Sequence, residues 1–541
     1  MRGGADGQFS VELEGNQQNR LLYEYRQIFK YFTVKRNHSL RYPILNDDII
    51  NRILTAIIFF DKKDVLYHYR CQMPVGQGGF HVGLLSLQQP PYLKISMHDY
   101  MQPFDNNGFL YVYDCGSIPK EFIIREVNGL IKKRKPHKID MLFLSHFDCD
   151  HICGTPNLLA KRKGLKVNTI VIPYVDDAER LLAFGRAIID VEDGNGRIDS
   201  FFREMIINPI TTLQSYEPEI IIQIMGEDDE PPAGLEPREQ ILDDEDGSFR
   251  RILVPSNGTL SLQSNIWEKP TSSNGRVFIS KNNEFEVDSA SISTRWRLKP
   301  WVRKINSITL DNFKRAVETQ VSWTHGSFDS EISKSDTMRN LVTKHRTKVA
   351  TAYKNTFGDK NLTSLCLFSG PDASSKINAA TILPYYPFSS KNDVAWIGTG
   401  DIPLKKSNDI NDFEAAYKGE LSDIVTYMFP HHGSIENSDP SRLPTAAYFR
   451  VVSADPSHEW EHPHSDLVKA ATGHGNKFRH VRTIKLSAFA EAMILYPKPE
   501  DHKLPNLYVF AKITRKNILL SSVDQTSVDT QQPQPVTTID L

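Results

Sequence analysis

The chain has 541 residues, which is too many for one ordinary domain core and enough for a large fold with insertions. Its formal net charge is −2 and 24% of its residues are charged, which excludes the overall basic field that by itself marks a nucleic-acid-binding protein. Its five cysteines, an odd number, form no paired CxxC pattern, so neither a structural zinc site built on such pairs nor a redox dithiol is indicated.

The chain contains no segment that approaches the roughly 18 uninterrupted apolar residues of a membrane span. Its first residues, MRGGADGQFSVELEG, lack the apolar core of a signal peptide. Cysteines without a pairing pattern are typical of reduced thiols in the cytoplasm. We therefore expect a soluble, cytoplasmic protein that contacts no membrane.

Residues 1–70 are predicted to form a helical N-terminal arm. Apolar residues recur there at helical spacing, first in LLYEYRQIFKYF and then in DDIINRILTAIIFF. An amphipathic arm of this kind could bind a protein partner, or it could simply pack one face against the main domain. A protein partner could also bind the long insertion that is predicted to interrupt the main domain.

Two segments of mixed strands and helices predict a layered α/β domain. The first covers residues 71–177, where apolar runs such as FLYVYDCG and IDMLFLSH flank the helical stretch KEFIIREVNGLIKKRK. The second covers residues 359–515, where TSLCLFSG, VAWIGTGD and DIVTYMFPHHGS continue the pattern. Residues 178–358 lie between them as a predicted insertion, with strands followed by helices.

Two stretches have the composition of a chain that cannot bury enough apolar surface to order itself. Residues near 226–250 are acidic, rich in Pro and Gly and poor in aromatic residues, so they are predicted to be mobile. Residues 516–541 are polar and contain proline, and they are predicted to form a disordered tail.

The stretch SHFDCDHICG directly follows an apolar run and holds His146, Asp148, Asp150 and His151 within six positions. Imidazole and carboxylate groups are ligands that suit Zn²⁺ or Mn²⁺. Taken alone, the stretch could also be a polar surface turn, because Asp tolerates turn backbones.

Three further apolar runs end in the same kind of chemistry. Asp401 follows WIGTG, the pair His431 and His432 follows YMFP, and EWEHPHSD supplies His462 and His464. Four strand ends that carry Asp or His predict one site, because loops at strand ends bring short side chains together.

The residues at this point carry a resemblance. HxDxDH resembles the HxHxDH signature of the metallo-β-lactamase superfamily, with Asp148 in place of the second histidine. The ordered motifs resemble the ComEC-type branch, which includes the hydrolase domain of bacterial DNA-uptake channels and stand-alone relatives. The resemblance covers about 71–175 and 359–500. Its motifs are VGQG (75–78), YDCGS (113–117), SHFDCDHICG (145–154), NLTSLCL (361–367), TGDI (399–402), FPHHGS (429–434) and HPH (462–464).

The chain departs from that branch at three positions, Gly79, Cys153 and Glu461, where an acidic residue, a glycine and a glycine are usual. None of these changes removes a ligand, although Glu461 could change the preference for substrate charge. No membrane channel accompanies the domain, so DNA uptake itself is not implied.

The resemblance implies an αββα sandwich that binds two divalent metal ions, Zn²⁺ or Mn²⁺. One ion would be bound by His146, Asp148 and a histidine of the 431–432 pair, and the other by Asp150, His151 and His462. Asp401 would bridge the two. Three carboxylates would leave about one positive charge on two divalent ions, and the oxygen ligand at position 148 makes Mn²⁺ a candidate beside Zn²⁺. The implied metal ligands are His146, Asp148, Asp150, His151, Asp401, His431 and His462.

Further residues are expected to serve the reaction. Asp150, His432 and His464 are the predicted catalytic residues, with His432 chosen to protonate the leaving oxygen. His464 could instead be a surface residue at the start of a helix. Asp114 and Asn361 are expected to position other groups, Asp114 by hydrogen bonds within the loop that bears His146.

Basic residues suggest how a nucleic acid would bind. Two basic runs, 132–138 and 161–166, flank the ligand loop and are expected to lie beside the proposed metal ions, and residues 294–304 alternate Arg and Lys with tryptophan. The runs could equally be solvated helix ends, and residues 294–304 a half-buried edge strand. The predicted nucleic-acid contacts are Lys132, Lys133, Arg134, Lys161, Arg162, Arg295, Trp296 and Arg297.

The leading hypothesis is a metal-dependent phosphodiesterase or nuclease that cleaves DNA with a water molecule activated by two metal ions. A second is a hydrolase of a small phosphoester or nucleotide. A third is a partner-regulated scaffold whose metal ions are structural. Structural metal sites usually have four ligands and are closed, so seven ligands around a cleft argue against this hypothesis.

Overall fold

The computed structural model describes much of the chain from residue 66 onwards. The described residues are 66–87, 108–160, 165–194, 198–231, 234–235, 250–255, 266–270, 275–281, 283–289, 292–356, 363–372, 377–383, 394–456, 462–473, 476–497, 507–513, 517–524 and 538–540. The chain divides into two compact units, one of residues 60–90 and 96–496 and the other of residues 1–59, 91–95 and 497–541. The predicted helical arm lies outside the described residues except for its last five.

The larger unit contains two mixed sheets. The first has the strand order β13-β18-β1-β2-β3-β4-β5-β6-β9-β8. Its strands are β1 (Leu66–Gln72), β2 (His81–Ser86), β3 (Phe109–Tyr113), β4 (Lys138–Phe143), β5 (Lys166–Pro173), β6 (Ile220–Ile224), β8 (Ile266–Lys269), β9 (Arg276–Ser280), β13 (Ile377–Leu383) and β18 (Phe489–Pro497). Strands β1 to β3 pair antiparallel, whereas β3 to β6 are parallel.

The second sheet has the strand order β17-β16-β15-β14-β12-β11-β10-β7. Its strands are β7 (Arg250–Pro255), β10 (Asn283–Ser289), β11 (Ile292–Arg303), β12 (Ser364–Pro371), β14 (Ala395–Gly398), β15 (Ile424–Met428), β16 (Phe449–Ser453) and β17 (Lys477–Val481). Strands β14 to β17 are parallel, and β7, β10, β11 and β12 pair antiparallel. The α/β class predicted from the sequence is therefore confirmed.

The two sheets pack face to face, as the alternation of side chains along their strands requires. In β12, Leu365 and Leu367 join a core cluster that also contains Tyr111 and Tyr113 of β3 in the other sheet. The intervening Cys366 and the following Phe368 point to the opposite side, into a cluster with helical residues. One apolar core thus lies between the sheets, and further cores lie outside them.

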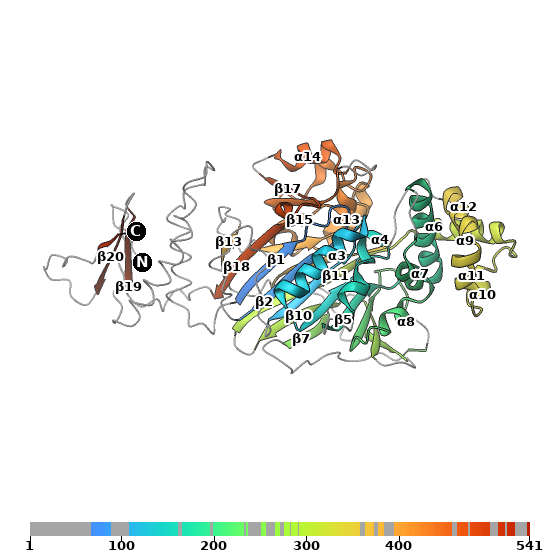
Figure 1. Ribbon diagram of the computed structural model, residues 1–541, viewed down its shortest axis with the longest axis horizontal. Helices are drawn as coiled ribbons and strands as arrows, with labels where there is room; N and C mark the ends of the chain where they lie inside the picture. Colours follow the sequence, from blue (N-terminus) through green and yellow to red (C-terminus); the bar gives the residue numbers. More distant parts are fainter. Residues whose placement is uncertain are drawn as a thin grey trace. The chain divides into compact units, whose positions relative to one another are not determined.

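Helices cover both outer faces. The first sheet is covered by α3 (Lys120–Gly129), α5 (Thr155–Leu158), α6 (Asp177–Gly194), α7 (Ser200–Ile207) and α8 (Pro209–Gln214). Helices α9 (Ser307–Val321), α10 (Phe328–Ile332), α11 (Thr337–Lys344) and α12 (Arg346–Thr356) pack on α6, on α7 and on one another. The second sheet is covered by α13 (Ser407–Ala416) and α14 (Ser465–Ala471). Figure 1 shows α3 along the first sheet and α13 and α14 beside β15 and β17, so the order of layers is helix, sheet, sheet, helix.

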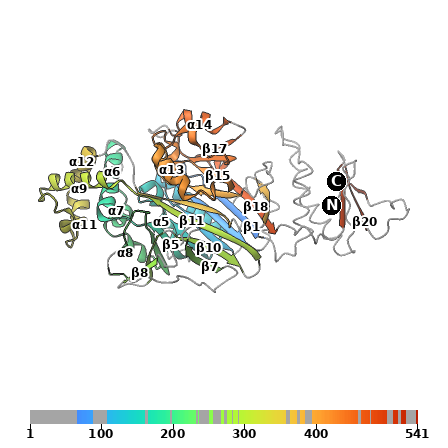
Figure 2. The ribbon, with the colours of Figure 1, turned by 180° about the vertical axis from the view of Figure 1, so that it is seen from behind.

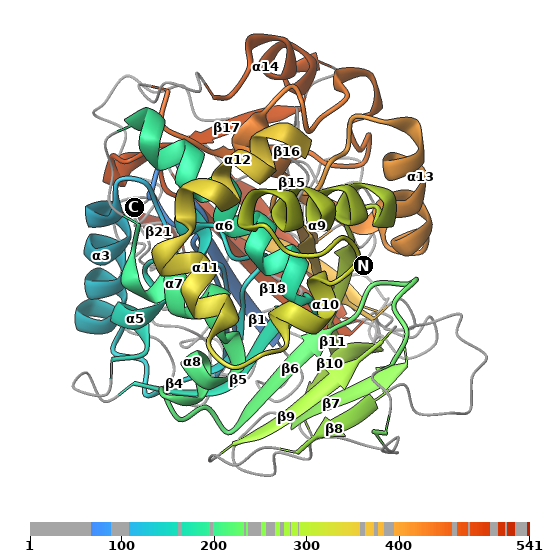
Figure 3. The ribbon, with the colours of Figure 1, turned by 90° about the vertical axis from the view of Figure 1, so that its right-hand side faces the viewer.

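The segment predicted as an insertion, 178–358, does not form a separate body. Its strands β6, β8 and β9 extend the first sheet, and β7, β10 and β11 extend the second. Figure 2 shows β7, β10 and β11 side by side at one end of the second sheet. Its helices pack on one another, with α12 against both α6 and α9, as Figure 3 shows. This segment therefore brings α6 close to the ends of the central strands.

The smaller unit contains a sheet of β19 (Leu507–Ile513), β20 (Asn517–Asp524) and β21 (Thr538–Asp540), in that order. The prediction that residues 516–541 form a disordered tail is therefore wrong for β20 and β21, which pair antiparallel. The apolar run ILL (518–520) in β20 favours a strand, but the polar composition of residues 516–541 as a whole led to the prediction of disorder. Among the described residues, no helix is long and apolar enough to cross a membrane.

Candidate metal centre

The predicted ligands lie just beyond the carboxyl ends of three strands. His146 follows β4 in the first sheet, Asp401 follows β14, and His431 and His432 follow β15 in the second sheet. Because β14 and β15 are parallel neighbours, their ends meet at one edge. Packing of the two sheets then brings this edge to the loop after β4. Residues that are about 280 positions apart in the chain come together in this way.

The loop after β4 continues into the short helix α4 (Cys149–Ile152), and Asp148 stands at its N-cap. The Asp148 carboxylate makes no capping hydrogen bond, although an aspartate at an N-cap usually does. Within α4, Asp150 and His151 are both buried. A single helical turn therefore presents an acid and an imidazole toward the interior.

Asp401 lies between two imidazoles. Its Oδ2 is 3.4 Å from Nε2 of His146 and its Oδ1 is 3.3 Å from Nε2 of His151. These three buried residues form one group whose ligand atoms all lie within 4.8 Å of one another. Each carboxylate oxygen thus faces a different histidine, as a bridging ligand of two ions would require.

A second group of ligand atoms overlaps the first. It consists of Asp150, His151 and His432, whose ligand atoms also lie within 4.8 Å of one another. Nε2 of His432 is 2.9 Å from Oδ2 of Asp150, and Nε2 of His151 is 4.0 Å from the same oxygen. His151 belongs to both groups, but one nitrogen lone pair binds one ion, so Asp401 is the residue able to serve both sides.

Hydrogen bonds to Nδ1 orient three of the histidines. Nδ1 of His151 is 2.8 Å from Oδ2 of Asp114, Nδ1 of His432 is 2.8 Å from the carbonyl oxygen of Ser453, and Nδ1 of His431 is 2.7 Å from Oδ1 of Asn437. Each of these oxygens is an acceptor, so each Nδ1 carries the proton and each Nε2 lone pair faces the cluster. Histidine ligands of metals are commonly held in this way.

The residues present fit divalent ions. Nε2 of His146 and of His151, Oδ1 of Asp148 and Oδ1 of Asp401 are buried and make no hydrogen bond. Two facing acceptors at about 3 Å repel each other unless a cation lies between them, and the donor set of imidazole and carboxylate suits Zn²⁺ or Mn²⁺. The two overlapping groups could therefore hold two ions.

The pKa values of His146 and Asp150 show that these side chains lie in a cluster of opposite charges. Burial and His151 lower the pKa of His146, but the carboxylates of Asp401 and Asp148 outweigh them and raise it to about 9. Burial would raise the pKa of Asp150, yet His151 and His432 hold it well below its usual range. Without metal, protons partly neutralise the cluster, and divalent ions would replace those protons.

Asp114 and Ser145 hold the loop that carries the ligands. The Asp114 carboxylate accepts from the backbone N–H of Ser145 at 2.7 Å, in addition to its hydrogen bond with His151. The Ser145 hydroxyl lies 2.9 Å from both Asp114 Oδ2 and Nδ1 of His146. Asp114 thus lies where the motif YDCGS predicted it, within reach of the loop after β4.

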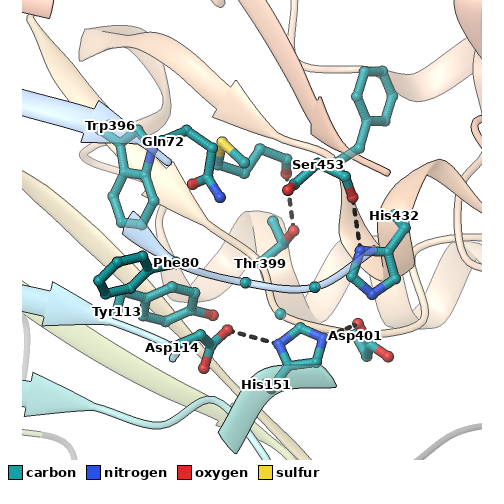
Figure 4. Close-up of a pocket in the computed structure, with 15 residues that line it drawn as sticks. Gln72, Phe80, Tyr113, Asp114, His151, Trp396, Thr399, Asp401, His432 and Ser453 are labelled. Atoms are coloured by element: carbon teal, nitrogen blue, oxygen red, sulfur yellow. Dashed lines mark hydrogen bonds and ion pairs between the residues drawn. The ribbon is translucent and has the colours of Figure 1, made fainter. Parts of the chain in front are cut away.

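A small cavity lies beside these groups. It has a volume of about 40 Å³ and is lined by Tyr113, Asp114, His151, Trp396 and Asp401, among others. Figure 4 shows His151 between Asp114 and Asp401, with His432 held by Ser453. At roughly 10–15 Å³ for each water molecule, the cavity has room for a few waters, so a larger substrate would have to contact the centre from outside.

The pair His431 and His432 adopts an uncommon backbone. Their φ values are 46° and 54°, in the left-handed region that non-glycine residues rarely occupy. This backbone sends the two neighbouring side chains to different members of the cluster: His432 toward Asp150, and His431 with Nε2 3.7 Å from Oδ2 of Asp401. Such strain at a functional site persists where the surrounding contacts hold it.

The structure does not bring the two histidines of HPH into either group. The His462 ring lies 5.7 Å from the His431 ring, centroid to centroid, at the edge of the cluster. His464 caps α14, where its Nδ1 accepts from the backbone N–H of Asp466, and 42% of its side chain is exposed. His464 thus takes the surface position at a helix start that the sequence left open.

Two of the predicted nucleic-acid contacts are wrong because their side chains are buried. Trp296 is fully buried between the sheets, where its indole N–H donates to the Ser369 hydroxyl at 2.9 Å. Arg297 is 2% exposed and pairs with both Glu284 and Glu420. Neither side chain is available to a base or a phosphate. Arg295 is exposed and pairs with Glu286.

The expectation that the first basic run lies beside the ligands is also wrong. Lys132 and Lys133 are exposed, but they precede the amino end of β4, whereas His146 follows its carboxyl end. Six strand residues at about 3.3 Å each separate the two ends by about 20 Å. Outside the described residues lie Lys161, Arg162 and Asn361, and so does the side chain of Arg134.

Sequence reasoning missed three residues that contact the cluster: Arg186, Asn437 and the backbone carbonyl group of Ser453. Arg186 lies on α6, in the segment predicted as an insertion, and Asn437 lies six residues after His431. Asn437 could have been predicted, because its amide follows the histidine pair closely in the sequence. No local sequence pattern distinguishes a functional arginine such as Arg186 within an amphipathic helix.

The chain matches no model of a known protein family, and no curated protein matches it either. The function is therefore inferred from the geometry of the centre.

Proposed function

We propose that this chain is a metal-dependent hydrolase of phosphodiesters, built on a metallo-β-lactamase-like architecture with a two-ion centre. One observation carries the proposal: two overlapping groups of buried His and Asp side chains turn their ligand atoms toward one another, and several of these atoms have no hydrogen-bond partner. The layers of helix, sheet, sheet and helix and the ordered motifs support the same family.

Bound divalent ions would supply Lewis-acid activation of water and neutralise charge on a phosphate. The residues of the chain would hold these ions and keep the ligand atoms in the orientation that binding requires. Asp401 offers one oxygen to each side, and Asp114 holds His151 in the tautomer that keeps its Nε2 lone pair free for an ion. His432 is held in the same way by Ser453, so we assign it to metal binding rather than to protonation of the leaving oxygen.

The resemblance to the ComEC-type branch favours DNA as the substrate. The placement of basic residues favours a small phosphodiester instead. Lys132 and Lys133 lie at the far end of β4, and Trp296 and Arg297 are buried, so none of these four predicted contacts forms a basic track that leads to the centre. Small phosphodiesters are therefore a second candidate that this observation supports.

The substrate class can be tested with the purified full-length chain. It would be incubated with Mn²⁺ or with Zn²⁺ and then with labelled single-stranded DNA, labelled double-stranded DNA or bis(p-nitrophenyl) phosphate. Cleavage of DNA supports the nuclease, and cleavage of the small diester alone supports the second candidate. A protein that binds metal and cleaves none of the three substrates would contradict the proposal and support a scaffold with structural metals.

A single substitution tests the centre itself. We expect Asp150→Ala to lower turnover of the cleaved substrate by more than about 100-fold, because losing a ligand costs more than the 10–100-fold typical of residues that only orient ligands. Circular dichroism should show an unchanged fold. Asp329→Ala, at an 80% exposed carboxylate on α10, is the matched control and should keep full activity. Full turnover in the Asp150→Ala protein would remove Asp150 from the chemistry.

A further inference from the structure

Arg186 reaches the metal centre from α6. It is 8% exposed, so its charge is buried with the cluster. Its Nη1 lies 3.0 Å from Oδ2 of Asp148, and its Nη2 lies 3.1 Å from Nε2 of His431. One guanidinium thus contacts two of the side chains predicted to bind metal, and these two come from different sheets.

The hydrogen bonds fix what each partner offers to Arg186. Nδ1 of His431 donates to Asn437, so its Nε2 is the acceptor, and a guanidinium is able only to donate. The lone pair of His431 that would bind an ion is therefore directed at Arg186. Oδ2 of Asp148 forms an ion pair with Nη1 of Arg186, and an ionised carboxylate oxygen is likewise a pure acceptor.

The two atoms that Arg186 contacts, Oδ2 of Asp148 and Nε2 of His431, lie on one side of the centre. Oδ2 of Asp148 is also 3.6 Å from Nε2 of His146, and Nε2 of His431 is also 3.7 Å from Oδ2 of Asp401. An ion among His146, Asp148, His431 and Asp401 would compete with Arg186 for Nε2 of His431 and would lie beside the same Asp148 carboxylate, whose Oδ1 makes no hydrogen bond. Arg186 contacts Asp148 and His431, so its charge competes most directly with an ion on this side of the centre.

Charge balance points the same way. Three carboxylates face the cluster, namely Asp148, Asp150 and Asp401, and together they carry three negative charges. One divalent ion and the Arg186 guanidinium together carry three positive charges, so they balance these carboxylates. The Asp114 carboxylate that holds His151 adds one more negative charge, so a second divalent ion would meet at most about one uncompensated negative charge and would be repelled by the buried guanidinium.

From this geometry we infer that Arg186 is a tethered cation that competes with one of the two metal ions. The ion beside Asp150, His151 and His432 binds tightly, and the ion beside His146, Asp148 and His431 binds only as Arg186 is displaced. This inference rests on the proposed metal centre. It makes the two ions unequal, and it gives α6, from a segment outside the resemblance, control over how many ions the centre holds.

Metal binding to the metal-free full-length protein tests the inference without any assay of activity. Mn²⁺ would be titrated against wild type and Arg186→Met by isothermal calorimetry, with Zn²⁺ in a parallel series. Wild type should bind one ion tightly and a second more weakly. Arg186→Met should tighten the weaker site by at least about tenfold, because a nearby buried positive charge is removed. The tight site should change less.

Arg203→Met is the matched control, because Arg203 is an exposed arginine on the neighbouring helix α7, and it should leave both affinities unchanged. If Arg186→Met does not fold, Arg186→Lys replaces it. Lysine keeps the charge but loses the two-pronged contact, so the weaker site should tighten by a smaller factor. Unchanged affinities in the folded variant, or two equal sites in wild type, overturn the inference. Absence of any metal binding by wild type instead overturns the proposed function.

Discussion

The orientation of three imidazoles decides what the centre is able to bind. His151, His432 and His431 each donate Nδ1–H to an oxygen of a different kind: a carboxylate, a backbone carbonyl and a side-chain amide. Each Nε2 is then left as an acceptor, although each is buried beside carboxylates. An anionic ligand would be repelled there, and a metal cation is favoured.

Asp114→Asn tests this orientation at the level of one atom. The amide has nearly the same shape, but it lacks the charge and can turn its NH₂ group toward Nδ1 of His151, which favours the wrong tautomer. Affinity for Mn²⁺ or Zn²⁺ should fall by about 10–100-fold. Competition with a chromophoric chelator measures this, with Asp329→Asn as the exposed control. An unchanged affinity would show that Asp114 does not set the tautomer.

At the scale of elements, α4 owes its position to very close backbone packing. A Cβ placed on Gly116 would lie 2.4 Å from the carbonyl carbon of Asp150, and one on Gly78 would lie 2.7 Å from the Asp150 carbonyl oxygen. These distances are far shorter than ordinary contacts. The glycines of the motifs YDCGS and VGQG therefore let two loops touch the ligand helix directly.

Gly116→Ala should consequently displace α4. The added methyl group meets backbone rather than a flexible side chain, so we expect a loss of stability of about 1–3 kcal/mol. Metal affinity should fall with it, because Asp150 and His151 move together. Gly419→Ala adds the same methyl group where nothing lies within 4 Å, and it should change neither property. Denaturant unfolding and chelator competition give the two values, and retention of both in Gly116→Ala contradicts the packing argument.

A buried ion pair joins elements of the two sheets. Arg70 of β1 contacts both oxygens of Glu491 in β18, at 2.6 and 2.8 Å. The same guanidinium donates to the carbonyl oxygen of Val394, just before β14, and to the hydroxyl of Thr426 in β15. The pair thus links the first sheet to the central strands of the second.

A double-mutant cycle tests this link. Arg70→Met leaves the Glu491 carboxylate buried without its charge partner, so the free energy of unfolding should fall by about 3–5 kcal/mol. Arg70→Met combined with Glu491→Leu removes both charges and should recover much of that loss. Urea unfolding measures each variant. A double variant that is as unstable as the sum of its singles would show that the two residues do not act as a pair.

The sequence predicts the central strands well, because β4, β14 and β15 are apolar runs that end in His or Asp. It misleads in β11, where residues 294–304 read as a basic stripe with tryptophans. The alternation there places Trp296 between the sheets and Arg297 on the other face, paired with Glu420. A partner 123 residues away leaves no local trace, so burial of this arginine could not be predicted. Arg186 was missed for the same reason.

At the scale of the whole molecule, the core between the sheets contains two histidines. His68 packs against Trp296 with ring centroids 4.3 Å apart, and His81 stacks on Trp396 at 3.9 Å. Burial, and then the positive charge of Arg70, lower the pKa of both histidines well below the ordinary value of about 6.5. The folded protein therefore keeps them neutral at a pH where the unfolded chain takes up protons.

This difference predicts a loss of stability in acid. Below about pH 6.5 the unfolded chain binds more protons than the folded one, so stability falls as pH falls, by up to about 1.4 kcal/mol per pH unit for each histidine. His81→Phe removes one such group and should flatten the slope measured by urea unfolding between pH 6.5 and 5. His325→Phe, at a 75% exposed side chain, should leave the slope as in wild type. An equal slope in His81→Phe and wild type would refute the assignment.

The ligands of the metal centre are divided between two halves of the molecule, with His146 to His151 on the first sheet and Asp401 to His432 on the second. A chain in which only one half has formed possesses only part of the ligand set, and the remaining side chains hold an ion weakly. Metal occupancy would therefore depend on assembly, because an ion would be retained only once both sheets have met. The binding free energy of that ion would then be added to the native state alone, so an occupied centre would also stabilise the packing of the two sheets.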